Sequence, residues 1–357
     1  MTHLLVAVSA HGFGHLAQSA PVLNRLRQQL PQLQLTLRSG LPQPVLARRV
    51  DGVFALQSEA DDFGMVMRDA LAVDVAASAE RYRELHRHWD AQVDVVARQL
   101  ERAAPDLILA DVPYLTLAAA ARVGIPAVAM CCLNWADIYW YYCSDLSEAA
   151  PVHDQMLAAY NSARLFLRTE PAMPMPGLDN LRPIGPVAYR GRSRRAELAE
   201  RFGLADDERL VLIGMGGIAF RLPLEQWPAM PGIRLVVQRD WGVRRDDVIV
   251  LEDTGMIFSD VLASSDAVIT KPGYGTFAES AVAGVPMLYV PREDWPEQRY
   301  LVEWLEQQLP CAAIAHGELA AGRITAPLQQ LWAQPPARGG IPDGVSVAAD
   351  CLAGLLG

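Results

Sequence analysis

Residues 267–280 read AVITKPGYGTFAES and contain the clearest signal of the fold in this chain. The apolar run 267–270 is typical of a buried parallel strand, and it passes through a proline–glycine turn into a helical sequence. The N–H groups of a first helical turn have no partner within their own helix and attract anions. We therefore expect a diphosphate to bind here. Its expected partners are the backbone at Gly273, Tyr274, Gly275 and Thr276 and the ammonium of Lys271.

The same order of strand, turn and helix recurs along the chain of 357 residues. It predicts an α/β protein with two Rossmann-like, doubly wound domains facing across a cleft, in which ligands lie beyond the carboxyl ends of the strands. Strands are expected at 4–9, 33–38, 105–111 and 126–132, and then at 210–213, 234–238, 248–251, 267–270 and 287–290. Helices are expected at 16–30, 75–103 and 114–122.

Residues 170–188 are rich in proline and glycine, so neither a helix nor a central strand is expected to persist there. We place the domain junction in this stretch. The predicted N-terminal domain covers residues 1–172, the linker 173–190 and the C-terminal domain 191–342. The basic cluster 189–195 is interpreted as a solvated linker face rather than an anion site.

Composition excludes several classes of protein. The formal net charge of −10 argues against nucleic acid as a partner. The sequence has no run of about 18 apolar residues, so stable membrane insertion is not expected. Five cysteines without a C-x-x-C pair indicate idle or core thiols rather than a disulfide or metal set. The N-terminus has no basic leader and is interpreted as a strand, so a cytoplasmic protein is expected.

A second polar motif, HGFGH at residues 11–15, follows the first expected strand. It matches neither a dinucleotide fingerprint, nor a P-loop, nor a zinc-binding H-E-x-x-H. His15 begins the following helix, whose positive end is expected to lower its pKa and keep the imidazole neutral, able to accept a proton. Asp111 closes another strand, where its carboxylate can orient His15. The alternatives are a capping role for His15 and an N-cap role for Asp111.

Three further groups are candidates. Gly216 and Gly217 follow the first strand of the C-terminal domain and can contribute to the diphosphate site or simply form a tight turn. Glu297 and Gln298 are suited to sugar hydroxyls, or they open an ordinary helix. Trp135 belongs to an aromatic cluster, residues 135–142, that lines an acceptor site or packs in the core. Glu279 lies one turn into its helix, where it can accept both hydroxyls of a ribose.

Together these motifs resemble the glycosyltransferases of the GT-B fold. Gly14-His15, Asp111 with a trailing Gly-Ile-Pro at 124–126, and Glu279 with Glu297-Gln298 resemble the UDP-glycosyltransferases. The peptidoglycan N-acetylglucosaminyltransferase is similar in its glycine turn, Glu and Gln. The HGFGH motif, residues 134–139 and GYGT at 273–276 resemble the glycosyltransferase-like N-terminal half of plant L-arabinokinases.

The chain also departs from the UDP-glycosyltransferase signature. Lys271 stands where that signature has His, and Gly275 stands where it has Asn. Its Trp-x-Pro-Gln, which stacks on uracil, is replaced by 251–258, and the loop 291–298 is two residues longer.

The resemblance implies an inverting, metal-independent glycosyltransferase of the hexosyltransferase class. Its co-substrate is a nucleotide sugar, expected to be a UDP-sugar, with no other cofactor, and its acceptor is a small or carrier-bound hydroxyl compound. His15 is the implied base and Asp111 its partner, and His11, Gly12, Phe13, Gly14 and Trp135 lie on the acceptor side. A C-terminal helix, 343–357, is implied to pack back on the N-terminal domain.

Two alternatives stay open. A non-hydrolysing sugar-nucleotide epimerase has the same fold and needs further carboxylates, for which Asp61, Asp62, Glu293 and Asp294 are available. A non-catalytic sugar- or nucleotide-binding protein is the other.

Overall fold

The computed structural model describes residues 2–69, 71–216, 221–292 and 294–357. The chain divides into two compact units. Unit 1 comprises the residues up to Arg68, Ala72–Val187 and Asp343–Gly357, and unit 2 comprises Asp69–Leu71 and Ala188–Pro342. The main division falls between Val187 and Ala188, inside the stretch expected to be the linker.

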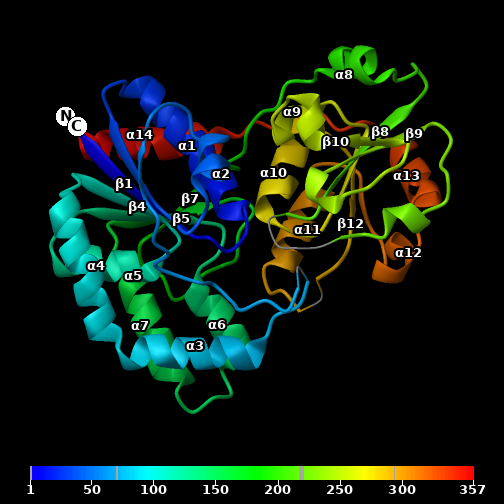
Figure 1. The fold of residues 1–357 in the computed structure, drawn as a ribbon. Coiled ribbons are helices and arrows are strands. Elements are labelled where there is room, and N and C mark those ends of the chain that lie inside the picture. The colour runs from blue at the N-terminus through cyan, green and yellow to red at the C-terminus, as the bar shows by residue number, and fades with distance from the viewer. Residues whose placement is uncertain (1, 70, 217–220, 293) are drawn as a thin grey trace. The chain divides into compact units, whose positions relative to one another are not determined.

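Unit 1 is built on a seven-stranded parallel sheet in the order β3-β2-β1-β4-β5-β6-β7 (Figure 1). Its inner strands are continuous apolar runs, as expected when helices cover both faces of a parallel sheet. The strands are β1 His3–Val8, β2 Gln34–Arg38, β3 Ala55–Gln57, β4 Leu107–Asp111, β5 Ala127–Cys131, β6 Leu165–Thr169 and β7 Leu181–Ile184. The helices are α1 Gly14–Gln29, α2 Gln43–Ala47, α3 Val75–Arg87, α4 Trp89–Ala103, α5 Tyr114–Arg122, α6 Trp135–Cys143, α7 Ala149–Asn161 and α14 Asp343–Leu356.

Unit 2 has a six-stranded parallel sheet in the order β10-β9-β8-β11-β12-β13. Its strands are β8 Arg209–Gly214, β9 Ile233–Val237, β10 Val248–Val250, β11 Ala267–Thr270, β12 Met287–Tyr289 and β13 Cys311–Ala313. Its α-helices are α8 Arg195–Phe202, α9 Phe258–Ala263, α10 Tyr274–Ala283, α11 Gln298–Glu306, α12 His316–Ala320 and α13 Thr325–Trp332. Short 3-10 turns occupy Leu224–Gln226, Arg239–Trp241 and Leu251–Thr254. Two parallel, doubly wound sheets confirm the predicted fold class.

The strand order creates one switch point in each sheet, between β1 and β4 in unit 1 and between β8 and β11 in unit 2. At such a point the chain leaves the two neighbouring strands in opposite directions and opens a crevice beyond their carboxyl ends. The motif at 11–15 follows β1 and Asp111 ends β4, while Gly216 and Lys271 follow β8 and β11. The candidate residues of both units therefore occupy switch points.

The last helix, α14, belongs to unit 1 and packs against α1 and β7 (Figure 1). Ala348, Ala349 and Leu352 form its fully buried face. Its first turn approaches the backbone of Gly185 so closely that a Cβ on Gly344 would lie 2.0 Å from the Gly185 carbonyl oxygen. Glycine is therefore required at the start of α14.

The elements differ from the expected ones in several places. The single helical region expected at 75–103 is two helices, because the chain leaves helical geometry at His88. The sequence pattern also missed β6, α6 and α7, which lie between the clear strand signals of the two halves. Among the described residues, no helix is both long and apolar enough to cross a membrane.

Candidate functional site

His15 and Asp111 form a buried pair at the switch point of unit 1. His15 lies in the first turn of α1, and Asp111 ends β4, whose register places it beside Val8 of β1. The Nδ1 atom of His15 lies 2.9 Å from Oδ1 of Asp111, and the Asp111 side chain is fully buried. The structure thus brings together the two residues that the sequence placed at one sheet edge.

The second carboxylate oxygen of Asp111 also has a donor. The hydroxyl of Ser19, which lies one turn after His15 on α1, donates a hydrogen bond of 2.7 Å to Oδ2 of Asp111. Sequence reasoning missed Ser19. Its spacing of four residues from His15 places both side chains on one face of α1, and this periodicity was the available signal.

The pKa of His15 reverses the sequence-based expectation. The positive end of α1 was expected to lower this pKa, but it is raised well above its ordinary value. Burial lowers it, yet the neighbouring Cys131 and the hydrogen-bonded carboxylate of Asp111 raise it by more. An adjacent anion in a buried site outweighs the partial charge of a helix end.

Cys131 ends β5 and lies beside the pair, with its Sγ 3.7 Å from Nδ1 of His15. The polar atoms of His15, Asp111 and Cys131 all lie within 4.8 Å of one another. The 2.9 Å between the His15 and Asp111 atoms is a hydrogen-bond length, whereas two ligands at about 2.1 Å from a tetrahedral zinc stand further apart. In this structure the cluster has the spacing of a hydrogen-bonded network.

A wall of the site is formed by Trp135, the first residue of α6. Its ring contacts the imidazoles of both His11 and His15, with centroid separations of 5.1 and 5.6 Å. Its indole N–H donates to Oδ2 of Asp62 over 2.7 Å. Gly64 permits this packing, because a Cβ there would lie 2.7 Å from the Trp135 ring.

Asp62 is a residue that sequence reasoning singled out only for the epimerase alternative. Burial raises its pKa to about 6, against the lowering effects of the His15 charge and of hydrogen bonds from Trp135 and Ser9. Its neighbour Asp61 accepts instead from the guanidinium of Arg38 over 2.6 Å. Of the other two carboxylates considered for that alternative, Glu293 lies outside the described residues and Asp294 is exposed.

The aromatic cluster 135–142 divides between the two roles considered for it. Trp135 and Tyr139 are buried, whereas Trp140 and Tyr141 are exposed on the outer face of α6. Within the motif 11–15, Gly12 takes a positive φ of 80°, which favours glycine, and Phe13 is partly exposed. Core packing therefore accounts for Tyr139, while Trp135 faces the two histidines.

In unit 2, the stretch that begins with AVITKPGYGT forms β11, a turn and α10. Gly273 precedes the first helical residue, Tyr274, and Thr276 lies half-buried in the first turn. Glu279 lies in the second turn and is almost wholly buried. The first turn of α10 therefore presents the backbone amides and the positive helix end that bind anions in other proteins.

Gly216 and Lys271 adjoin each other at the switch point of unit 2. A hydrogen bond of 2.6 Å from the Thr270 hydroxyl to the Gly214 carbonyl ties the ends of β11 and β8 together. A Cβ on Gly216, whose φ is 79°, would lie 3.7 Å from Nζ of Lys271. Gly217 lies outside the described residues. The structure thus places two of the predicted anion-binding segments side by side.

Lys271 carries a perturbed ammonium. Burial and the charge of Arg292 together lower its pKa to about 7, against the opposing charge of Glu297. Its side chain makes no hydrogen bond or ion pair within the part of the chain that the structure describes. A half-buried cation without such a partner, next to the amides of a helix N-terminus, is suited to an anionic ligand.

The loop 291–298 after β12 is held by its own side chains. The indole N–H of Trp295 donates to Oε2 of Glu297 over 2.9 Å, and the Arg292 guanidinium lies 4.3 Å above the Trp295 ring. The backbone N–H of Arg292 donates to the Gln298 side chain. Both residues predicted to hold the donor sugar therefore also shape this loop.

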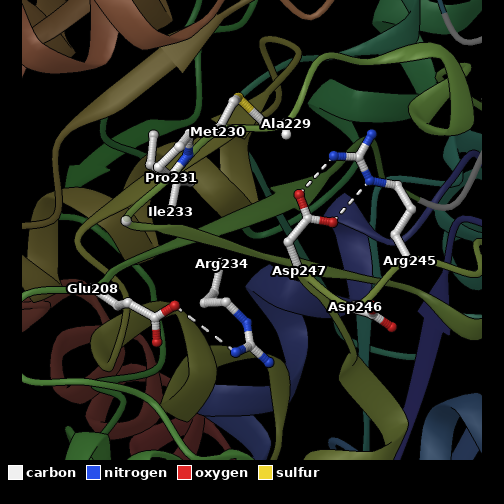
Figure 2. Close-up of a pocket in the computed structure, with 10 residues that line it drawn as sticks. Glu208, Ala229, Met230, Pro231, Ile233, Arg234, Arg245, Asp246 and Asp247 are labelled. Carbon is white, nitrogen blue, oxygen red and sulfur yellow. Dashed lines mark hydrogen bonds and ion pairs between the residues drawn. The ribbon is translucent and has the colours of Figure 1, made fainter.

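A shallow pocket of about 480 Å³ lies elsewhere in unit 2 (Figure 2). It is lined by residues that precede or begin β8, β9 and β10, so it lies at the amino ends of the strands, opposite the edge described above. Its charged groups face one another. Arg245 is paired with Asp247, and Arg234 with Glu208. We assign no ligand to it.

Comparison with known proteins bears on the fold and on the family resemblance of the chain. Residues 255–338 match the glycosyltransferase family 28 C-terminal domain. The chain is 26% identical over 360 residues to an L-arabinokinase of Arabidopsis thaliana, covering 98% of this chain but 34% of that protein. It thus spans about a third of that relative. It is 23% identical over 303 residues to an uncharacterised glycosyltransferase of Methanopyrus kandleri, covering 79% of this chain and 85% of the relative.

Solved structures agree on the fold. A UDP-glucosyltransferase from Polygonum tinctorium, solved in complex with 3,4-dichloroaniline, superposes with a TM-score of 0.58 at 17% identity, covering 99% of this chain and 98% of that one. The resemblance drawn from the sequence is thereby confirmed. The chain has the GT-B fold of the nucleotide-sugar-dependent glycosyltransferases, and its residues 255–338 correspond to the C-terminal domain of glycosyltransferase family 28.

Proposed function

We propose that the protein is an inverting, metal-independent glycosyltransferase that moves a sugar from a nucleotide-diphosphate donor to a hydroxyl acceptor. The observation that carries the proposal is the buried contact of 2.9 Å between Nδ1 of His15 and Oδ1 of Asp111 at the switch point of unit 1. A buried imidazole held at one nitrogen by a carboxylate is the arrangement of a general base.

In the proposed reaction His15 acts on the acceptor. With its proton on Nδ1 facing Asp111, Nε2 carries the lone pair that removes the acceptor hydroxyl proton. The acceptor oxygen then forms a bond to the anomeric carbon of the donor sugar while the bond from that carbon to the diphosphate breaks, which inverts the configuration. Asp111 stabilises the imidazolium that results.

Unit 2 is proposed to hold the donor. The departing diphosphate gains negative charge, which the amides of Gly273–Thr276 and the Lys271 ammonium are placed to stabilise. In this proposal the lysine supplies the positive charge that other transferases take from a metal ion. Glu279 is proposed to bind the ribose, and Glu297 and Gln298 the sugar.

The donor is proposed to be a UDP-sugar. Calorimetry with UDP, TDP and GDP, alone and as their sugars, tests this proposal on the wild type and on Glu279→Gln. One nucleotide is expected to bind, and the variant is expected to bind it about 10- to 100-fold more weakly, because a neutral amide with a single acceptor oxygen replaces a charged acceptor of two hydroxyls. Glu318→Gln is the matched control, since Glu318 pairs with Arg323 on the surface of unit 2.

The outcomes separate the candidate functions. Failure of all three nucleotides and their sugars to bind a folded wild-type protein would rule the transferase out. Conversion of a UDP-sugar without any acceptor would instead indicate an epimerase. That result would be unexpected for Asp61, whose carboxylate is already bound by Arg38 and by the hydroxyl of Thr116.

A further inference from the structure

We infer that Ser19 is a positioning residue that holds Asp111 in the orientation required by His15. The inference rests on the proposed function of the His15–Asp111 pair. A single helix, α1, contacts both oxygens of one carboxylate. Nδ1 of His15 lies 2.9 Å from Oδ1, and the Ser19 hydroxyl lies 2.7 Å from Oδ2. Because His15 and Ser19 are four residues apart, they project from the same face of α1 toward the end of β4.

The Ser19 contact is not ordinary helix packing. A buried serine inside a helix commonly donates to the carbonyl four residues earlier in its own helix. The Ser19 hydroxyl donates instead to a side chain of another element, and both Ser19 and Asp111 are fully buried. Without Ser19, the second oxygen of this buried carboxylate would lose its side-chain donor, which is costly for a charged group.

Two donors on two oxygens fix the plane of the carboxylate. Oδ1 is then directed at Nδ1 of His15, which keeps the proton on that nitrogen and leaves the lone pair on Nε2. Ser19 also withdraws negative charge from Asp111. When the hydroxyl is removed, the carboxylate becomes a stronger partner for the imidazolium, so the pKa of His15 is expected to rise further.

Other groups also face His15, and the test must leave them unchanged. Cys131 approaches from β5, with Sγ at 3.7 Å from Nδ1. Asp62 approaches from the loop after β3 and interacts through its charge, and His11 lies across the Trp135 ring. Ser19 makes none of the hydrogen bonds described for these groups, so its replacement acts on His15 through Asp111.

The experiment is an NMR titration of the histidine side chains in the full chain, with the His15 signal assigned by its loss in His15→Gln. Ser19→Ala is expected to raise the His15 pKa by about half a unit or more. Ser19→Thr retains the hydroxyl and is expected to restore the wild-type value. Ser78→Ala is the matched control. Ser78 is equally buried in unit 1 and donates to the Asp74 carbonyl over 2.7 Å, away from Asp111.

A His15 pKa that is unchanged or lowered in folded Ser19→Ala would overturn the inference. If Ser19→Ala does not fold, Ser19→Cys keeps a side chain of similar shape while weakening the donor, and it must shift the pKa in the same direction. The titration needs neither donor nor acceptor. The positioning role can therefore stand or fall independently of the transferase activity, which the nucleotide-binding experiment tests.

In an active enzyme the same substitution has a kinetic consequence. The acid limb of the pH profile of kcat/KM is expected to move to higher pH in Ser19→Ala with the His15 pKa, since the base must be neutral to accept a proton. Ser19→Thr is expected to return the limb to its original position. A merely structural role for Ser19 would lower the rate equally at every pH.

Discussion

The two switch points are built in opposite ways. In unit 1 the candidate residues are bound to one another: Asp111 is held by His15 and Ser19, and Asp62 is held by Trp135. At the switch point of unit 2 the candidate groups are backbone amides, glycine and the ammonium of Lys271, which is unpaired within the described residues. Glu297 and Gln298 of the same unit are held within their own loop. The first arrangement is complete before any ligand arrives, whereas the second has charge that a ligand would neutralise.

This difference indicates which chemical role suits the sheet edge of each unit. A group that transfers a proton must keep a fixed orientation, and its hydrogen bonds are best made within the protein. A group that stabilises a leaving anion must have donors still available when that anion forms. Unit 1 meets the first requirement and unit 2 the second. Three substitutions test the comparison, in order of decreasing expected effect.

Replacement of His15 tests the proton-transfer role proposed for unit 1. His15→Gln is expected to lower kcat/KM by about 10²- to 10⁴-fold while leaving nucleotide affinity unchanged, because it removes a general base and no donor contact. The wild-type rate is expected to rise with pH through the raised pKa of His15, and the variant to lose this rise. Steady-state rates and calorimetry measure the two effects.

The control for this prediction is His86→Gln. His86 is also buried in unit 1, but it is bound by Tyr114 and Gln155. Wild-type turnover in His15→Gln, or an equal loss in both variants, would contradict the assignment of His15.

Substitutions of Lys271 test the anion-binding role proposed for unit 2. Its pKa of about 7, set by burial and by the Arg292 charge, means that the ammonium loses its proton as the pH rises above 7. Affinity for a nucleoside diphosphate is therefore expected to fall by up to about tenfold per pH unit between pH 7 and 9. Lys271→Met should bind weakly at every pH in this range, and Lys271→Arg should bind without the pH dependence. Calorimetry at several pH values measures these affinities. The same pH dependence of affinity in the wild type, Lys271→Met and Lys271→Arg would contradict this role.

Replacement of Asp62 is expected to have the smallest effect, a change in the free energy of unfolding. Its folded-state pKa of about 6 lies above the value of about 3.9 expected in the unfolded chain, so the folded state binds the proton more tightly. Stability is therefore lost as the pH rises from about 4 to about 6. Asp62→Asn removes this loss and is expected to be more stable than the wild type by about 1–2 kcal/mol at pH 7.

Urea unfolding at pH 4.5 and pH 7.5 measures the Asp62 effect. Asp61→Asn is the matched control, because Asp61 is equally buried but is paired with Arg38, so this variant is expected to lose stability at both pH values. The prediction for Asp62 fails if Asp62→Asn shows the same pH dependence as the wild type.

The sequence was sufficient for the two parallel sheets and for the meeting of His15 with Asp111. Both follow from local rules, namely apolar runs for buried strands and polar residues directly after them. The direction of the His15 pKa shift was wrong, because it depends on Cys131, which arrives from β5, over a hundred residues away. Ser19 was missed although its spacing from His15 places it on the same face of α1. Asp62 was considered only for the epimerase alternative, because its partner Trp135 comes from another element. The roles of the individual site residues stay predictions.

One further consequence concerns the order in which the chain is made. Unit 1 contains both the first strands and α14, so the residues of unit 2 are synthesised between two parts of one folding unit. Until α14 emerges, the side of α1 that it covers has no partner and remains exposed to the ribosome and to chaperones. Unit 2 meets no such delay, since its last helix, α13, precedes α14. The unit that holds His15 is therefore expected to be the second to mature, although it is the first to be translated.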